Sequence, residues 1–136
     1  MTRTEFEVRT DGPGLTEITD RVAGWLPDAS GVVTLFVRHT SCSLVIQENA
    51  DPDVRRDLLA WIDRLVPQAD TADMAYLRHR SEGPDDMPAH IKAAHVPVSL
   101  SIPAVDGRLL LGTWQGIYLW EHRDAPQTRR IVAVLS

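Results

Sequence analysis

Residues 32–47 read VVTLFVRHTSCSLVIQ, two apolar segments rich in β-branched residues on either side of a short polar segment. Short segments of this kind, bounded by polar residues, are typical of strands that pack against a core. We therefore expect strands over residues 32–38 and 43–47. The histidine and hydroxyl residues between them would then lie at the rim of a sheet.

The chain before these strands predicts a further strand and a helix. Apolar and polar residues alternate over residues 2–10, which favours a half-buried strand. Residues 16–26 carry apolar residues at helical spacing, with Thr16 placed to cap the start and Pro27 to end the helix.

A second amphipathic helix is expected directly after the central strands. Asp51 suits the cap of this helix and Pro52 its first helical position, and the helix should end near Pro67. Five apolar residues are expected to form its buried stripe: Val54, Leu58, Trp61, Ile62 and Leu65.

The rest of the chain predicts a loop, a short helix and more strands. Residues 68–85 are polar, and loops of this length in a compact domain are usually functional or mobile. Asp86 can cap a short helix, and Asp106-Gly107 predicts a turn between strands. The expected strands cover residues 98–105, 108–113, 116–122 and 129–135. These elements predict one α+β domain, residues 1–136, mostly an antiparallel β-sheet packed with a few helices.

Composition limits the kinds of partner. The 136 residues carry a formal net charge of −5 without a basic stripe, which argues against a nucleic-acid partner. No apolar run is long enough for a membrane span, and the N-terminus lacks the apolar stretch of a signal peptide, so the cytoplasm is the expected location. Arg129 and Arg130 are expected at a solvated strand edge. Cys42, which has no partner for a disulfide, is expected to be a small buried residue.

Three polar segments could carry chemistry. The first runs from His39 to Ser43, where a histidine and hydroxyls could act at a sheet rim; alternatively, they end a strand and satisfy a turn. In the second, Asp86 and His90 share a helix face, and the adjacent carboxylates suit a divalent cation or proton transfer. Alternatively, that segment is a capping aspartate beside a solvated one.

The third segment contains Gly112 to Gly116 and then Glu121 to Asp124, which supply acid, base and cation at a strand end. The alternative is a hairpin with a charged terminus. Trp25 and Trp61 are expected in the core. Trp114 and Trp120 could lie in the core, at a subunit interface or against a ligand.

Three blocks, HTSCSLVIQENADPDV, EGPDDMPAHIK and GRLLLGTWQGIYLWEHRD, resemble in order and spacing the signature blocks of the YjbQ family, described as secondary thiamine-phosphate synthases. The resemblance implies an α+β fold, a homotrimer and a site between subunits. The functional residues that it implies are His39, Thr40, Asn49, Asp51, Asp85, Asp86, His90, Thr113, Trp114, Gln115, Glu121 and His122, with His79 just ahead of the second block.

The activity implied by this resemblance couples a pyrimidine diphosphate to a thiazole phosphate with loss of pyrophosphate. Asp85 and Asp86 could then bind magnesium, Arg123 or a helix N-terminus could hold phosphate, and Trp114 could stack on a ring. The sequence has no Gly-rich phosphate loop and one lysine, Lys92, so a different substrate stays open.

Two further functions are compatible with these residues. One is a hydrolase in which His39, His90 and His122 hold a metal that activates water. The possible cofactor is a divalent metal, Mg or Zn: a tightly bound zinc would favour this hydrolase, and a magnesium requirement would favour the transferase. The other is a non-catalytic trimer that binds a small anion. In each case the partner is a small phosphorylated or anionic molecule. We expect His39, Asp86, His90 and His122 to converge in one pocket, and the two histidines at 90 and 122 to matter more for activity than for stability.

Overall fold

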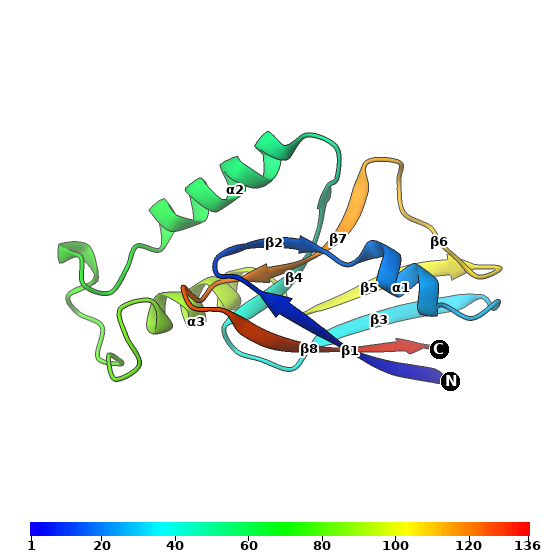
Figure 1. Cartoon of the computed structure of the whole chain (residues 1–136), viewed down its shortest axis with the longest axis horizontal. Helices are drawn as coiled ribbons and strands as arrows, with labels where there is room; N and C mark the ends of the chain where they lie inside the picture. The colour runs from blue at the N-terminus through cyan, green and yellow to red at the C-terminus, as the bar shows by residue number, and fades with distance from the viewer.

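A computed structural model describes residues 1–136 (Figure 1). The strands are β1 (Thr2–Thr10), β2 (Gly14–Glu17), β3 (Gly31–Val37), β4 (Cys42–Glu48), β5 (Ser99–Val105), β6 (Arg108–Leu109), β7 (Gln115–Glu121) and β8 (Gln127–Leu135). The helices are α1 (Thr19–Trp25), α2 (Pro52–Leu65) and α3 (Asp86–His95), with a 3₁₀ turn at Ala72–Met74. The fold is α+β with antiparallel strands, as predicted, but the strands form two sheets where one was expected.

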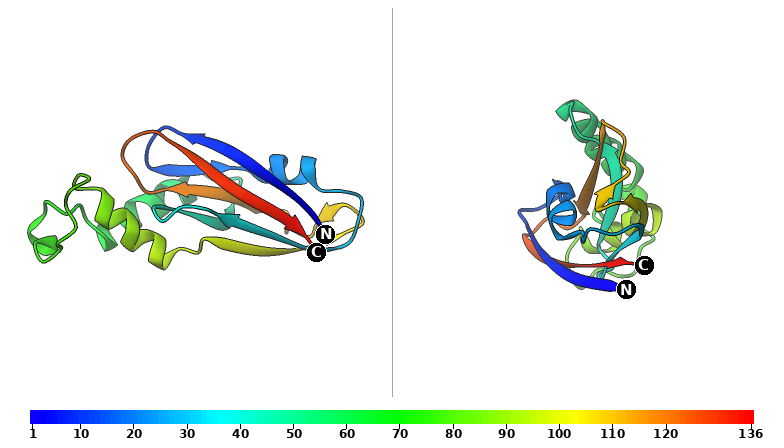
Figure 2. Two further views of the ribbon diagram at one scale, coloured as in Figure 1. Left: turned by 90° about the horizontal axis from the view of Figure 1, so that it is seen from below. Right: turned by 90° about the vertical axis from the view of Figure 1, so that its right-hand side faces the viewer.

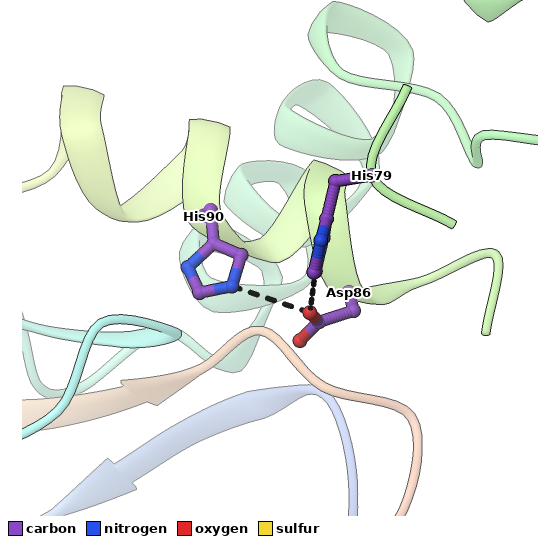
Figure 3. A group of neighbouring side chains, drawn as sticks. All are labelled: His79, Asp86 and His90. Atoms are coloured by element: carbon purple, nitrogen blue, oxygen red, sulfur yellow. Dashed lines mark hydrogen bonds and ion pairs between the residues drawn. The ribbon is translucent and has the colours of Figure 1, made fainter. Parts of the chain in front are cut away.

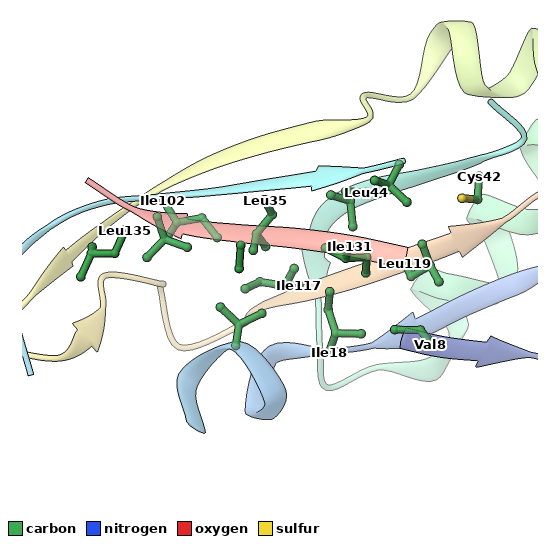
Figure 4. Packing of buried hydrophobic residues seen from close by; sticks show 14 of the residues in the cluster. Val8, Ile18, Leu35, Cys42, Leu44, Ile102, Ile117, Leu119, Ile131 and Leu135 are labelled. Carbon is green, nitrogen blue, oxygen red and sulfur yellow. The ribbon is translucent and has the colours of Figure 1, made fainter. Parts of the chain in front are cut away.

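The strands form two sheets that enclose the core (Figures 1 and 2). One sheet has the order β1-β8-β3-β5-β6 and the other β2-β7-β4, and every pairing is antiparallel. A cluster of 15 buried residues draws on both sheets and on α1 (Figure 4). Val33, Leu35 and Val37 alternate with more exposed residues along β3, so the period of two that marks a strand also selects its inner face.

The strands expected over residues 2–10, 32–38 and 43–47 are confirmed within one residue at each end. The cap of α2 is also confirmed, because a carboxylate oxygen of Asp51 accepts a hydrogen bond of 2.9 Å from the backbone N–H of Asp53. These features depend on neighbours in the sequence, and local chemistry is sufficient to place them.

The expected helix over residues 16–26 is wrong at its start. Thr16 lies in β2, where it pairs with Leu119, and the helix begins only at Thr19. The Thr19 hydroxyl accepts a 2.8 Å hydrogen bond from the backbone N–H of Ile117, which fixes the start of α1 against β7. Pairing with a distant strand satisfies the backbone of residues 14–17 and outweighs their helical spacing.

The hairpin after β5 differs in length from the prediction. Asp106 and Gly107 have φ angles of 50° and 76°, so the expected turn is confirmed with both central residues in the left-handed region that tight hairpins require. The strand expected over 108–113 is limited to β6. The chain then leaves the sheet, and the backbone N–H of Gly112 donates to Oε1 of Gln115 at 2.8 Å.

Helix α2 does not bury the stripe that its sequence predicts. Ile62 is buried, whereas Trp61 is 56% exposed and Leu65 is 50% exposed. Figure 1 shows most of α2 lying apart from the two sheets, and the part of its apolar face formed by Trp61 and Leu65 is open to solvent. The expectation that Trp61 lies in the core is therefore wrong for the single chain.

The burial of Trp120, Trp114 and Cys42 can also be compared with the predictions. Trp120 is buried and Trp114 is 63% exposed. Cys42 is fully buried, and burial raises the pKa of its thiol to about 12, in keeping with an unreactive small residue. No helix has the length and apolar character needed to span a membrane.

Candidate functional site

Three side chains meet at the start of α3 (Figure 3). Asp86 is the first residue of the helix, His90 follows one turn later on the same face, and His79 reaches in from the preceding loop. Their ligand-type atoms all lie within 4.8 Å of one another. We call these residues the His–Asp cluster. It confirms that Asp86 and His90 share a face and adds His79, which periodicity alone could not place.

Arg123 holds the two adjacent carboxylates Asp85 and Asp86. Its Nε donates to Asp85 Oδ2 at 2.8 Å and its NH1 lies 2.9 Å from Asp86 Oδ1. Asp85 Oδ2 also accepts from the backbone N–H of Asp124 at 2.9 Å. The prediction that Asp86 caps the helix is wrong, because the cap position is occupied by Asp85 and neither carboxylate makes a capping bond. Arg123 is engaged by these carboxylates rather than free to hold phosphate.

The hydrogen bonds of His90 define its proton positions. Nδ1 lies 3.0 Å from the carbonyl oxygen of Thr40, which can only accept, so Nδ1 carries a proton. Nε2 lies 3.2 Å from Oδ2 of Asp86, which is also an acceptor. In a neutral ring Nε2 has no proton and its lone pair faces the carboxylate. A second proton or a metal ion is needed between these two atoms.

Distances in the cluster are close to those of a metal centre. Bonds of 2.0–2.1 Å in a tetrahedral zinc site imply ligand atoms roughly 3.3 Å apart. The His90–Asp86 separation of 3.2 Å already fits, while the His79 Nε2–Asp86 Oδ2 contact of 2.6 Å must lengthen. The His79 side chain is 42% exposed, so a small shift of its ring meets little resistance. The bond from His90 Nδ1 to a backbone carbonyl is the partner that metal-binding histidines usually have.

Asp86 is buried but stays ionised. Burial raises the pKa of its carboxyl, yet the hydrogen bond from His79 and the charge of Arg123 outweigh burial and hold the pKa below its ordinary value. A carboxylate that remains charged, with one oxygen fixed by Arg123 and the other facing two imidazoles, is suited to bind a cation.

His39 and Thr40 lie on an open groove next to the cluster. The groove has a volume of about 510 Å³ and is lined by Phe36, Val37, Arg38, His39, Thr40, His90, Ala93, Ala94 and Val98. His90 belongs both to this lining and to the His–Asp cluster. Nε2 of His39 accepts a 2.9 Å hydrogen bond from the backbone N–H of Arg130, so this nitrogen is not free to bind a metal.

His122 and Glu121 belong to a buried polar network rather than to the groove. Oε1 of Glu121 accepts from Arg129 at 2.7 Å and from Thr10 at 2.8 Å. Arg129 also donates to the side chain of Ser41 at 3.0 Å. The expectation that Arg129 lies at a solvated edge is wrong, since it is 4% exposed. Alternation along β8 contained the signal, because Ile131, two residues later, is a core residue on the same face.

The His122 ring is buried next to the network formed by Glu121 and Arg129. Its Nε2 lies 2.8 Å from the Ser43 hydroxyl, and its Nδ1 is buried without a partner. Burial, with the nearby charge of Lys92, lowers the pKa of His122 to about 3. The structure therefore brings His39 and His90 to one groove and Asp86 to the adjoining cluster, while His122 is enclosed beside Ser43.

The remaining predicted site residues lie at the far end of the β4–β7 pair. Asn49 Nδ2 donates to the carbonyl oxygens of Thr113 and Gln115, each at 3.4 Å, and Asp51 caps α2. Trp114 is exposed beside them and accepts from Asn49 N–H through its carbonyl. This group and His39 lie at opposite ends of β4. Six residues of a strand span about 20 Å, so a single chain does not bring the two groups together.

Known proteins resemble this chain over almost its whole length. A UPF0047 protein from Synechocystis sp. is 46% identical over 132 residues, covering 95% of this chain and 87% of the relative. UPF0047 protein YugU of Bacillus subtilis is 39% identical, with coverage of 85% and 83%. A conserved hypothetical protein of Thermus thermophilus superposes with a TM-score of 0.85 at 37% identity, covering 98% of this chain and 99% of that one. The UPF0047 protein YjbQ-like family model matches residues 4–136, and the chain belongs to this family.

Proposed function

We propose that the chain is a metal-dependent hydrolase that holds zinc through His79, Asp86 and His90. The observation that carries the proposal is the His90 ring, whose Nδ1 proton is fixed on the Thr40 carbonyl and whose Nε2 faces Oδ2 of Asp86 at 3.2 Å. Two nitrogens and one carboxylate oxygen leave a fourth zinc position open, as in catalytic zinc sites. This set keeps His90 from the predicted ligands and replaces His39 and His122 by His79 and Asp86.

Zinc in such a site supplies Lewis acidity and activates water near neutral pH. In hydrolysis the water oxygen bonds to the electrophilic carbon or phosphorus, and the bond to the leaving group breaks. The leaving group departs with the electron pair and takes up a proton. Thr40 and Arg123 act on the ligands: the Thr40 carbonyl fixes the His90 ring, and Arg123 holds the second Asp86 oxygen.

Zinc titration by calorimetry tests the proposal on the intact chain and on two variants. The wild-type chain should bind one zinc ion, and His90→Ala should lower the affinity at least about 100-fold because a ligand is lost. His95→Ala is the matched control, since His95 is exposed at the other end of α3. Equal zinc affinity in wild type and His90→Ala would overturn the zinc site.

Hydrolysis is then measured with p-nitrophenyl phosphate and p-nitrophenyl acetate, with zinc and after chelation. We expect turnover of at least one ester that chelation abolishes, zinc restores and His90→Ala lacks. Zinc binding without turnover of any ester would support the metal site and contradict the hydrolase activity.

The transferase implied by family resemblance remains a second prediction. Asp85 and Asp86 both contact Arg123, which leaves fewer oxygens for a magnesium ion that prefers carboxylates and water. An assay with the pyrimidine diphosphate, the thiazole phosphate and magnesium decides between the two functions. Product formation that zinc does not support would favour transfer, and ligand binding without any turnover would favour the non-catalytic anion-binding function.

The homotrimer is also part of the proposal. The cores of subunit interfaces are rich in apolar and aromatic side chains, and several large side chains of this kind are exposed in the single chain. They are Val32, Phe36, Trp61, Leu65, Leu110 and Trp114. Association would also allow the Asn49–Gln115 end of one copy to approach the groove of another. Light scattering that gives the mass of a single chain at micromolar concentration would contradict this part.

A further inference from the structure

The groove beside the His–Asp cluster is lined by both apolar and polar residues. Phe36 and Val37 come from β3, Ala93 and Ala94 from α3, and Val98 from the segment between α3 and β5. The polar lining residues are Arg38, His39, Thr40 and His90. A molecule in the groove would therefore touch apolar side chains with one part while another part lies beside the metal ligand His90.

His39 has a defined tautomer. The backbone N–H of Arg130 donates to its Nε2 at 2.9 Å, and a backbone N–H has no other role than donor. Nε2 is therefore the unprotonated nitrogen, and the single proton of the neutral ring is on Nδ1. No group of the chain hydrogen-bonds to this Nδ1, and it is not among the buried unpartnered atoms.

The surroundings keep this ring neutral. Burial lowers the pKa of His39, and the charges of Arg129, Arg130 and Arg38 lower it further, against an opposing effect of Glu121. A neutral imidazole with a fixed N–H beside an open groove resembles the donors that stabilise developing negative charge on oxygen.

We propose that His39 is a hydrogen-bond donor, through Nδ1–H, to the oxygen that becomes negatively charged when an ester bound in the groove is hydrolysed. The inference rests on the proposed hydrolase. It assigns the substrate class as a small carboxylic or phosphate ester with an apolar group, which packs against Phe36, Ala94 and Val98. His39 then acts on the substrate and not on the metal.

Two variants separate the nitrogens of His39. In His39→Asn the amide nitrogen can occupy the region of Nδ1 and keep a donor, whereas in His39→Gln the side-chain oxygen can accept from Arg130 N–H but the donor near Nδ1 is lost. We expect kcat/KM to fall about 10²–10³-fold in His39→Gln, as for loss of an oxyanion donor, and clearly less in His39→Asn. Both variants should bind zinc as wild type does. Equal losses in the two variants, or lost zinc binding in either, would overturn the inference.

Long-range ¹H–¹⁵N spectra of the wild-type chain test the tautomer without any turnover. Nδ1 should be the protonated nitrogen of His39, and inorganic phosphate, used as an oxyanion probe, should shift its signal. A proton on Nε2, or no shift at saturating phosphate, would reject the inference. If the tautomer and the phosphate shift are found but no ester is hydrolysed, then the hydrolase is wrong and His39 is still an oxyanion donor.

Discussion

The His–Asp cluster and the buried network of Thr10, Ser41, Glu121 and Arg129 contain similar groups in opposite settings. In the network the carboxylate of Glu121 is 1% exposed and is satisfied by Arg129, Thr10 and backbone N–H groups. In the cluster Asp86 is equally enclosed, but His79 and His90 are 42% and 33% exposed and present nitrogens at one point. Buried polar groups that have their hydrogen-bond partners specify the fold. A cluster that is open to solvent and lacks some of its partners can bind a ligand.

The largest effect is expected inside the buried network. Arg129→Met should lower the free energy of unfolding by about 3–5 kcal/mol, because it leaves the Glu121 carboxylate buried without its partner. Denaturant unfolding measures this loss. Arg130→Met is the matched control, because the Arg130 side chain is 57% exposed and should change stability by less than about 0.5 kcal/mol. Equal effects at the two positions would show that the buried network contributes no more to stability than an exposed arginine does.

Zinc should stabilise the chain through the cluster alone. At a free concentration of 100 times its dissociation constant, a ligand that binds only the folded state contributes about 2.7 kcal/mol. Thermal unfolding should therefore shift upward with zinc in wild type and return after chelation. The shift should be absent in His90→Ala and present in His95→Ala. A similar shift in His90→Ala would place the zinc outside the cluster.

Acid should destabilise the chain through His122. Its folded pKa is about 3, below the ordinary value of 6.5, so the unfolded chain takes up a proton that the folded chain refuses. The stabilisation is complete above pH 6.5 and decreases as the pH falls toward 3. His122→Gln, which can still bond to Ser43, should be less stable at pH 7. Its melting temperature should also change less between about pH 6.5 and 4.5 than that of wild type. Parallel curves for the two proteins would contradict the low pKa.

The smallest effect is expected for His79→Ala without zinc. Its side chain is 42% exposed, and exposed ion pairs contribute about 0–1 kcal/mol. Asp86 also keeps its contact with Arg123 in this variant. Denaturant unfolding in the presence of a chelator measures the change. A loss as large as that of Arg129→Met would show that the cluster holds the fold together.

The stability expectations for two residues change with the structure. His90 is at the surface and is still expected to matter little for stability. His122 is 3% exposed and hydrogen-bonded to Ser43, so its truncation should destabilise the chain. Trp61, expected from its helical position to be essential to the core, is mostly exposed in the single chain.

Features that depend on neighbouring residues could be predicted from the sequence. Alternation placed β3 and β4, Asp51 and Pro52 placed the start of α2, Asp106-Gly107 placed a turn, and the spacing of Asp86 and His90 placed both on one helix face. Each follows from a backbone period or a turn of a few residues, which a short segment contains completely.

Contacts between distant groups could not be predicted from the sequence and became known with the fold. His79 joins Asp86 from a loop, Arg123 spans from the end of β7 to both aspartates, and Arg129 is enclosed with Glu121. Pairing with β7 also made residues 14–17 a strand in place of a helix start. These outcomes depend on contacts between segments far apart in the chain, and burial and hydrogen bonding between such segments outweigh local preference.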